Sequence, residues 1–266
     1  MNKRMVIFLS LLISLMLACG ITSNTGSGSG TGTTPQKQPG GIFSNPTATA
    51  TANPNPISIN DGLGSLNSYD MTIDFTSTGP DPSQSSTTTM EVKRSRDNDS
   101  SETDLNISSV PKGGGNPNTT ENYIYKIGND QCSGSGSDWT WTSYTPTQAE
   151  MSGVLKSMLG LTPLIDNPSF VAQETVNDIP SNHFTFKVSG LGVTSGAVVN
   201  VNSGDYWLAV DGQYIVKYTL VLETSDPNNS DLFHEEVSID LTQINQPVDI
   251  TFPQGCLAAS KVTPTP

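Results

Sequence analysis

The stretch Tyr69-Asp70-Met71-Thr72-Ile73-Asp74-Phe75-Thr76 carries apolar side chains at its odd positions and polar side chains at its even positions. Successive side chains of a β-strand point to opposite faces, so this period of two predicts a strand with one buried face. The stretch therefore predicts a β-sheet with one apolar face.

Similar patterns recur along the chain between turn-rich segments. Asp211-Gly212 stands between two apolar runs, 206–210 and 214–218. This arrangement is the strongest short-range signal for a β-hairpin. Further strands are expected at 87–94, 102–108, 122–127, 139–142, 171–176, 183–188 and 233–244, whereas 190–201 is expected to be irregular. The chain is therefore predicted to be mainly β.

One helix is expected within this strand-rich pattern, between Thr145 and Gly160. Thr145 is a candidate N-cap, Pro146 suits the first helical position, and Gln148 completes a capping box. The apolar residues at helical spacing are Met151, Val154, Leu155, Met158 and Leu159. A mainly β, α+β fold with one central helix follows. A second, small helical turn is expected near 161–166.

The amino terminus has the layout of a secretory signal. Lys3 and Arg4 precede a 13-residue apolar run, 5–17, which is too short to span a bilayer because about 20 residues are needed. Cys19 follows a small residue and resembles the lipobox of bacterial lipoproteins. That resemblance implies cleavage before Cys19 and acylation of its side chain, with palmitate as the type of group attached. The alternative is an ordinary cleaved signal with a chance cysteine.

Four segments follow from this layout. Residues 1–18 are expected to be a lipoprotein signal peptide, and 19–56 a lipidated cysteine followed by a disordered linker. Residues 20–56 are nearly all Gly, Ser, Thr, Asn, Pro, Gln and Ala, with Lys37 as their only charge. Such a composition buries too little apolar surface to offset the entropy of ordering the chain. The folded domain is expected over 57–257, and 258–266 is expected to be a flexible tail.

Charge excludes one class of partner. The chain has 12 Lys and Arg against 25 Asp and Glu, for a formal net charge of −13. Nucleic-acid binding needs clustered basic residues, so no nucleic-acid partner is expected. Electrostatic docking on anionic lipid is excluded for the same reason. Contact with a membrane must therefore come from the anchor or from an apolar pocket.

The number of cysteines supports the same location. With Cys19 assigned to lipid, Cys132 and Cys256 remain, and an even pair outside the cytoplasm is expected to form a disulfide. That bridge would tie a mid-chain loop to the last strand. The alternative is two separate buried thiols.

Residues for catalysis or metal binding are scarce. His183 and His234 each sit within an alternating strand, which favours exposed positions over a metal site. Asp97–Asp99 and Asp226–Asp231 do not match the ligand spacing of a calcium-binding hand, and Asx turns explain them. No Gly-x-Ser-x-Gly elbow is present. We expect no enzyme activity, no cofactor and no metal.

A set of short sequence features resembles the LolA/LolB and LppX/LprG group of envelope lipid and lipoprotein carriers. These features are Leu66-Asn67-Ser68-Tyr69, Tyr123-Ile124-Tyr125 ahead of Trp139 and Trp141, the hairpin segment Tyr206–Tyr214, and Pro247-Val248-Asp249-Ile250. The resemblance implies a strongly curved antiparallel sheet, an unclosed half-barrel, with a central helix covering its concave apolar face. It also implies that acyl chains sit between the sheet and the helix.

The expected function is therefore that of a monomeric, extracytoplasmic lipoprotein, held at the cell membrane or outer envelope by its lipid anchor. It would bind a lipid, a lipoprotein acyl chain or another hydrophobic ligand. The expected cavity residues are Met71, Ile73, Phe75, Met151, Leu155, Met158, Tyr218, Leu220 and Val237. The alternative is an envelope sensor or protein-interaction domain on the same fold without a transported ligand. A third possibility is a surface β-sandwich used in adhesion, which would have two packed sheets and no central helix.

Overall fold

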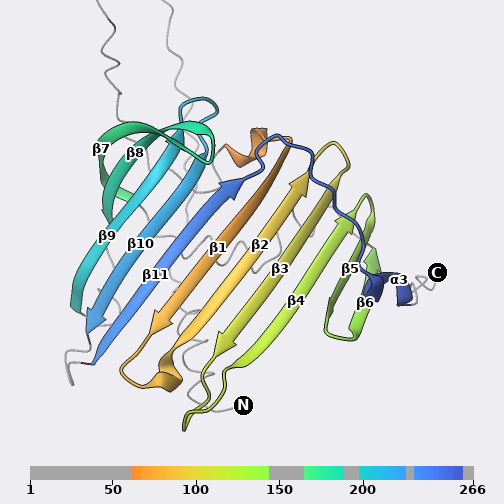
Figure 1. Cartoon of the computed structure of the whole chain (residues 1–266), viewed down its shortest axis with the longest axis horizontal. Coiled ribbons are helices and arrows are strands. Elements are labelled where there is room, and N and C mark those ends of the chain that lie inside the picture. Colours follow the sequence, from red (N-terminus) through yellow and green to blue (C-terminus); the bar gives the residue numbers. More distant parts are fainter. Residues whose placement is uncertain (1–61, 144–164, 189–197, 226–230, 260–266) are drawn as a thin grey trace, which may run out of the picture. The chain divides into compact units, whose positions relative to one another are not determined.

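A single antiparallel sheet organises the part of the chain that the computed structural model describes, residues 62–143, 165–188, 198–225 and 231–259 (Figure 1). Its eleven strands lie in the order β6-β5-β4-β3-β2-β1-β11-β10-β9-β8-β7. The strands are β1 (Ser68–Thr78), β2 (Ser86–Ser95), β3 (Ser100–Ser109), β4 (Asn118–Ile127), β5 (Asp130–Ser135), β6 (Asp138–Ser143), β7 (Ile165–Val176), β8 (Ile179–Val188), β9 (Val198–Ala209), β10 (Ile215–Ser225) and β11 (Leu232–Thr242). Two short 3-10 turns, η1 (Leu63–Ser65) and η2 (Pro82–Gln84), and one short helix, α3 (Gln254–Ala258), accompany them.

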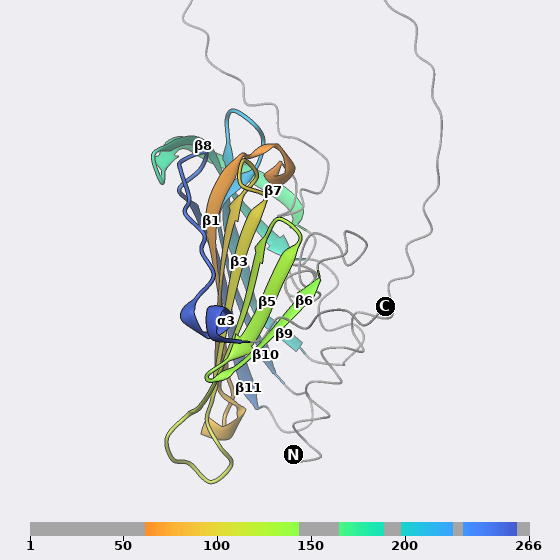
Figure 2. The ribbon, with the colours of Figure 1, turned by 90° about the vertical axis from the view of Figure 1, so that its right-hand side faces the viewer.

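The sheet consists of two meanders joined at one non-local pairing. Every neighbouring pair of strands is adjacent in the sequence except β1 and β11. These two strands pair in antiparallel fashion, with Ile73 opposite Ile239 and Phe75 opposite Val237. The meanders β1–β6 and β7–β11 extend from this seam in opposite directions. The sheet is curved and unclosed, and its outermost strands are β6 and β7 (Figure 2).

The two faces of the sheet differ sharply in chemistry. The face that carries Met71 and Ile73 of β1 holds most of the buried residues, and we name it the apolar face. The register places on it Met90 and Val92 of β2, Ile239 and Leu241 of β11, Tyr218 and Leu220 of β10, Tyr206 and Leu208 of β9, and Phe184 and Phe186 of β8. The other face, here the polar face, carries Asp70, Thr72 and Asp74 of β1. The alternation read from residues 69–76 is thus confirmed.

Neither free edge of the sheet presents a long, regular strand to which another strand could pair. Strand β7 contains Pro168, which lacks a backbone donor, and its pairing with β8 shifts register between Asp166 and Ser169 and again between Phe170 and Ala172. Strand β6 is short, and α3 packs against it. These features hinder the addition of a further strand to either edge.

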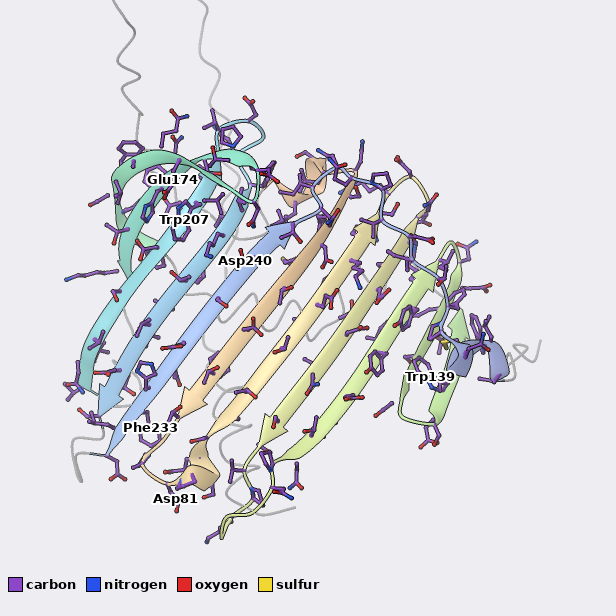
Figure 3. The ribbon with its side chains drawn as sticks, viewed as in Figure 1. Asp81, Trp139, Glu174, Trp207, Phe233 and Asp240 are labelled. Carbon is purple, nitrogen blue, oxygen red and sulfur yellow. A yellow bond between two sulfur atoms is a disulfide. The ribbon has the colours of Figure 1, made fainter. Side chains whose placement is uncertain are left out.

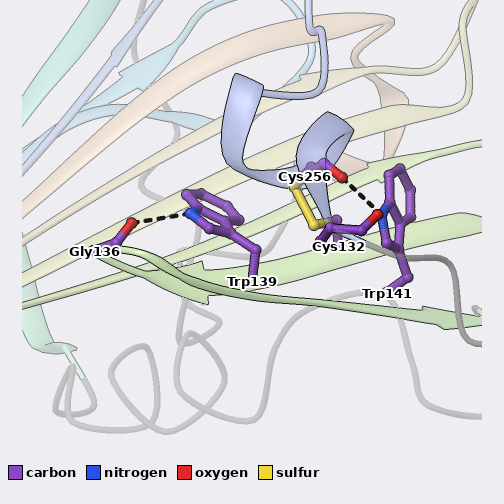
Figure 4. The surroundings of a disulfide bond; sticks show 6 residues. Cys132, Gly136, Trp139, Trp141 and Cys256 are labelled. Atoms are coloured by element: carbon purple, nitrogen blue, oxygen red, sulfur yellow. Dashed lines mark hydrogen bonds between the residues drawn. A yellow bond between two sulfur atoms is a disulfide. The ribbon is translucent and has the colours of Figure 1, made fainter.

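A disulfide joins Cys132 to Cys256, so the predicted pairing is confirmed. The prediction of a mid-chain loop bridged to a last strand is wrong, because Cys132 lies in β5 and Cys256 lies in α3. Around the bridge, the indole Nε1 of Trp141 donates hydrogen bonds to the carbonyl oxygens of Cys256 at 2.8 Å and Ala259 at 3.2 Å (Figure 4). A side chain at Gly255 would collide with the indole of Trp139. The end of the chain is thus fastened to the polar face of β5 and β6.

Several other expectations can be compared with the structure. All of the predicted strands are present, but the prediction misses β5, and 198–201 belongs to β9 and not to an irregular segment. The small helical turn near 161–166 is wrong at its end, because Ile165 and Asp166 begin β7. The predicted helix 145–160 lies outside the described residues, as do the signal peptide and the linker. Among the described residues, no helix is long and apolar enough to cross a bilayer.

The disulfide should stabilise the fold through a long covalent loop, since its cysteines are 124 residues apart. Replacing both cysteines, Cys132→Ser with Cys256→Ser, is expected to lower the free energy of unfolding by about 2–4 kcal/mol. Urea denaturation followed by tryptophan fluorescence measures this loss. A reductant should destabilise the parent protein and leave the double variant unchanged. Equal unfolding midpoints for the two proteins would contradict a stabilising role.

Candidate functional site

The predicted cavity residues that the structure describes all lie on the apolar face. Phe75, Val237 and Leu220 occupy directly opposed positions on β1, β11 and β10. Ile73 and Tyr218 flank Ile239 in the next row toward the other end of these strands, and Met71 follows on β1. The remaining predicted lining residues, Met151, Leu155 and Met158, lie outside the described residues. The sheet therefore brings six predicted residues from three strands into one surface.

An aromatic cluster extends this surface over β8 and β9, and the sequence prediction did not include it in the site. Phe184 stacks on Tyr206 with ring centroids 5.0 Å apart, and Phe186 lies 5.8 Å from Tyr206 and 5.4 Å from Tyr218. A Cβ at Gly204 would collide with the ring of Phe186, so this position needs glycine. In the sequence, the alternation of aromatic or apolar residues with other residues within 183–188 and 206–210 was the signal that could have indicated this cluster. Its proximity to Tyr218 depends on strand order.

Burial of the apolar face exceeds what one layer can provide. Met90 is 0% exposed, and Met71 and Tyr218 are each 1% exposed. A side chain standing on a sheet is shielded by its neighbours at the sides, but its outer end needs a second layer. Within the described residues, the sheet forms one layer and α3 lies on the polar face. The apolar face therefore has the burial of a core surface, and α3 does not lie on it.

Polar groups that interrupt the apolar face include the hydroxyls of Tyr218 and Tyr206 and the carboxyl group of Glu235. The hydroxyl of Tyr218 is buried and has no hydrogen-bond partner. Burial raises the pKa of Tyr218 and raises that of Tyr206 to about 12. Burial also raises the pKa of Glu235 on β11, which lies opposite Leu222 of β10. Each of these groups is neutral more readily than in water, as expected for polar atoms in an apolar surface.

The polar face contains a shallow depression of about 320 Å³ over β2, β3 and β4. Its lining residues are Thr89, Glu91, Asp104, Leu105, Asn106 and Tyr123. Most of these side chains are polar or charged, so the depression is unsuited to an acyl chain. The sequence prediction placed the cavity on the opposite face. We retain the apolar face as the candidate site because its lining buries large apolar side chains.

Charged side chains surround this depression. The ammonium of Lys93 lies 2.8 Å from the carboxylate of Glu91 and 3.2 Å from that of Glu102. Asp104 lies opposite Glu91 on the neighbouring strand. Its Oδ1 atom is buried and has no hydrogen-bond partner. Burial, with a further contribution from Glu102, raises the pKa of Asp104 to about 6.

A second cluster on the polar face joins β7 to β9. The ring of His183 stacks on the indole of Trp207, with centroids 4.4 Å apart. Its Nε2 atom lies 2.8 Å from Asp205, and its Nδ1 atom lies 3.1 Å from Glu174. Glu174 also accepts a hydrogen bond from the indole of Trp207, and Figure 3 shows these two side chains at the β7 end of the sheet. These contacts give His183 a structural role, because they join the edge strand β7 to β8 and β9. Among the described residues, no group of acidic, histidine or cysteine side chains is arranged to hold a metal ion.

Comparison with known proteins adds similarity at the level of the fold. A scan against models of protein families gave no match, and a search of curated protein sequences gave none. The chain is similar to the solved structure of LprF from Mycobacterium bovis, with 13% identity and a TM-score of 0.36 over 73% of this chain and 94% of that one. It is similar to lipoprotein LppX from Mycobacterium tuberculosis, with 14% identity and a TM-score of 0.33 over 71% and 92%. A LolA superfamily protein from Nitrosomonas europaea matches with 13% identity and a TM-score of 0.23 over 74% and 96%.

These matches include the group that the sequence features resemble. At TM-scores of this size, the function is argued from the residues of this chain alone.

The raised pKa of Asp104 predicts a pH-dependent cost to stability. The ordinary pKa of the group is 3.8 and its folded value is about 6, so the unfolded chain releases this proton first as pH rises. Stability contributed by the group falls between pH 4 and 6 and stays low above that range. Asp104→Asn removes the charge and should stabilise the protein at pH 7 by about 1 kcal/mol, after allowance for partial solvent screening.

Urea denaturation of the parent and Asp104→Asn proteins at pH 4 and pH 7 measures this effect. At pH 4 the two proteins should be nearly equal in stability. A difference of the same size at both pH values would refute the assignment to protonation.

Proposed function

We propose that this chain is a membrane-anchored, extracytoplasmic lipoprotein that binds a lipid, an acyl chain or another hydrophobic molecule. The ligand would lie between the apolar face and a helix formed by residues 145–160. The observation that carries this proposal is the apolar face of a one-layer sheet, on which large side chains of β1, β2 and β8–β11 are almost fully buried.

The connection between β6 and β7 is well placed to supply the cover. Residues 144–164 connect β6 and β7 in the sequence, and these are the two outermost strands of the sheet. As a helix, residues 145–160 would be about 24 Å long, the width of about five strands. Its expected apolar stripe, which includes Met151, Leu155 and Met158, could then face Ile73, Phe75 and Val237 in the middle of the sheet.

Burial of apolar surface would drive ligand binding. Each methylene group that moves from water into such a site contributes about 0.8 kcal/mol. Methionine side chains on the helix would adapt to acyl chains of different shape, because the thioether is flexible and polarisable. The large aromatic side chains on β8 and β9 would form the opposite end of the site.

The anchor would restrict where the domain acts. Lipid on Cys19 would hold the chain at a membrane, and residues 20–56 would separate the domain from it. A coil of 37 residues spans roughly 30–40 Å on average, which allows the domain to reach back to its own membrane. In this proposal, 57–257 is the binding domain and 258–266 is a tail after the disulfide-bonded helix.

A protein-interaction function is the second candidate, and the polar face favours it. Tyr123 stacks on Trp139 with centroids 5.8 Å apart beside the acidic residues Glu91 and Asp104. Aromatic residues are enriched where proteins meet. A sensor that uses this face would not need a ligand on the apolar face.

Substitution in the proposed covering helix separates the two candidates. Met151→Asp with Met158→Asp places charges on the stripe that would face the ligand, whereas Ser157→Asp places one on the other side of the helix. We expect the double variant to lose at least tenfold in affinity for a fluorescent fatty acid, with Ser157→Asp close to the parent. The proteins would be full chains carrying Cys19→Ala, and circular dichroism would verify folding. An unchanged affinity in the double variant would exclude this site.

The anchor can be tested independently. Cys19→Ala is expected to abolish acylation, so the protein should move from the detergent phase to the aqueous phase in Triton X-114 partitioning. Intact-mass measurement of the parent should find the two acyl groups that a diacylated cysteine carries. A parent protein that lacks acyl mass and partitions into water would rule out the anchor and leave ligand binding open.

A further inference from the structure

The hydroxyl of Tyr218 is an unpaired polar group in the middle of the apolar face. Tyr218 is 1% exposed, and its hydroxyl oxygen has no hydrogen-bond partner. Leaving a buried donor unpaired costs about 1–3 kcal/mol, and most buried hydroxyls in proteins are paired. A phenylalanine would fill the same space without this cost. The hydroxyl therefore calls for an explanation in terms of a partner that the protein does not provide.

Among the described residues, the neighbours of Tyr218 in the sheet are apolar or aromatic. The opposed residue on β11 is Ile239, and Phe186 on β8 lies 5.4 Å away between ring centroids. The opposed residue on β9 is Tyr206, whose ring packs on Phe184. Burial raises the pKa of Tyr218, and no charge among the described residues contributes to the shift. The group is a neutral donor that points away from the sheet backbone into the proposed ligand layer.

We propose that Tyr218 donates a hydrogen bond to the carbonyl oxygen of the bound ligand, which makes the ligand an acyl ester and not a plain hydrocarbon. This inference rests on the proposed function, since it requires a ligand on the apolar face. A carbonyl oxygen accepts a hydrogen bond and carries no charge, so it satisfies the hydroxyl without placing an ion in an apolar layer.

A second residue on the same face favours the ester over a free acid. The carboxyl group of Glu235 stands on β11 opposite Leu222, four residues along β10 from Tyr218. That separation is about 13 Å along the strand. Burial raises the pKa of Glu235, so this layer disfavours a charged carboxyl group. An ionised head group at Tyr218 would meet the same cost of desolvation, and an uncharged ester avoids it.

The test compares two probes with the same pyrenyl-alkyl chain, one ending in a methyl ester and one ending in a methyl group. The probes are the methyl ester of 12-(1-pyrenyl)dodecanoic acid and 1-dodecylpyrene, and the protein is the full chain carrying Cys19→Ala. Tyr218→Phe should weaken binding of the ester about tenfold, as expected for loss of one hydrogen bond of ordinary strength. Binding of the hydrocarbon should stay within twofold of the parent. The empty Tyr218→Phe protein should also melt at a higher temperature, because an unpaired buried hydroxyl is gone.

Tyr125→Phe is the matched control. Tyr125 is a buried tyrosine on the polar face, and its hydroxyl is hydrogen-bonded to Asp104. Its removal should lower the melting temperature and leave the binding of both probes unchanged. Loss of a hydroxyl then has opposite effects on stability at the two positions, which distinguishes an orphan group from a structural one.

The outcomes separate failure of this inference from failure of the proposed function. If the parent binds both probes and Tyr218→Phe binds both equally well, Tyr218 does not contact a carbonyl and the inference falls. If Tyr218→Phe weakens both probes to the same extent, the residue acts through packing and the inference also falls. If the parent binds neither probe, the proposed function itself fails. A lower melting temperature for Tyr218→Phe would mean that the protein or a bound water already satisfies the hydroxyl.

Discussion

The pairing of β1 with β11 is the contact on which the rest of the sheet depends. It brings together strands from opposite ends of the domain, with Met71, Ile73 and Phe75 opposite Leu241, Ile239 and Val237. All six side chains point to the apolar face, so a slip of one residue would turn one set toward the polar face. The register of β1 against β11 is therefore fixed by the apolar side chains that the two strands place on the same face. Without this seam, the chain would consist of two smaller sheets, each with a long additional edge.

The seam also determines where the sheet stays open. Since every other neighbouring pair is local in sequence, closing the chain at β1 and β11 leaves the free edges at β6 and β7, which are themselves consecutive strands. The sequence predicts an apolar helical stripe within residues 144–164, which connect these two strands.

The opposite face is held by different forces. The disulfide, Trp141 and Phe252 fasten the end of the chain to β5 and β6, with the two rings 4.6 Å apart. At the far end of the sheet, His183 and Trp207 clamp β7 to β9 through the carboxylates of Glu174 and Asp205. Both outer regions are therefore braced on the polar face.

The sequence by itself determined the local features. The alternation in 69–76, the Asp-Gly turn at 211–212 and the even pair of remaining cysteines each rest on nearby residues or on simple counting, and each is confirmed. Strand β5 was missed because Cys132 is its only strongly apolar residue, and pairing with β4 and β6 makes it a strand. Only the tertiary structure decided that β1 pairs with β11, that Phe186 approaches Tyr218 and that the Tyr218 hydroxyl is left unpaired. The physical reason is that period and turn chemistry act over a few residues, whereas strand order and hydrogen-bond satisfaction depend on which distant faces meet.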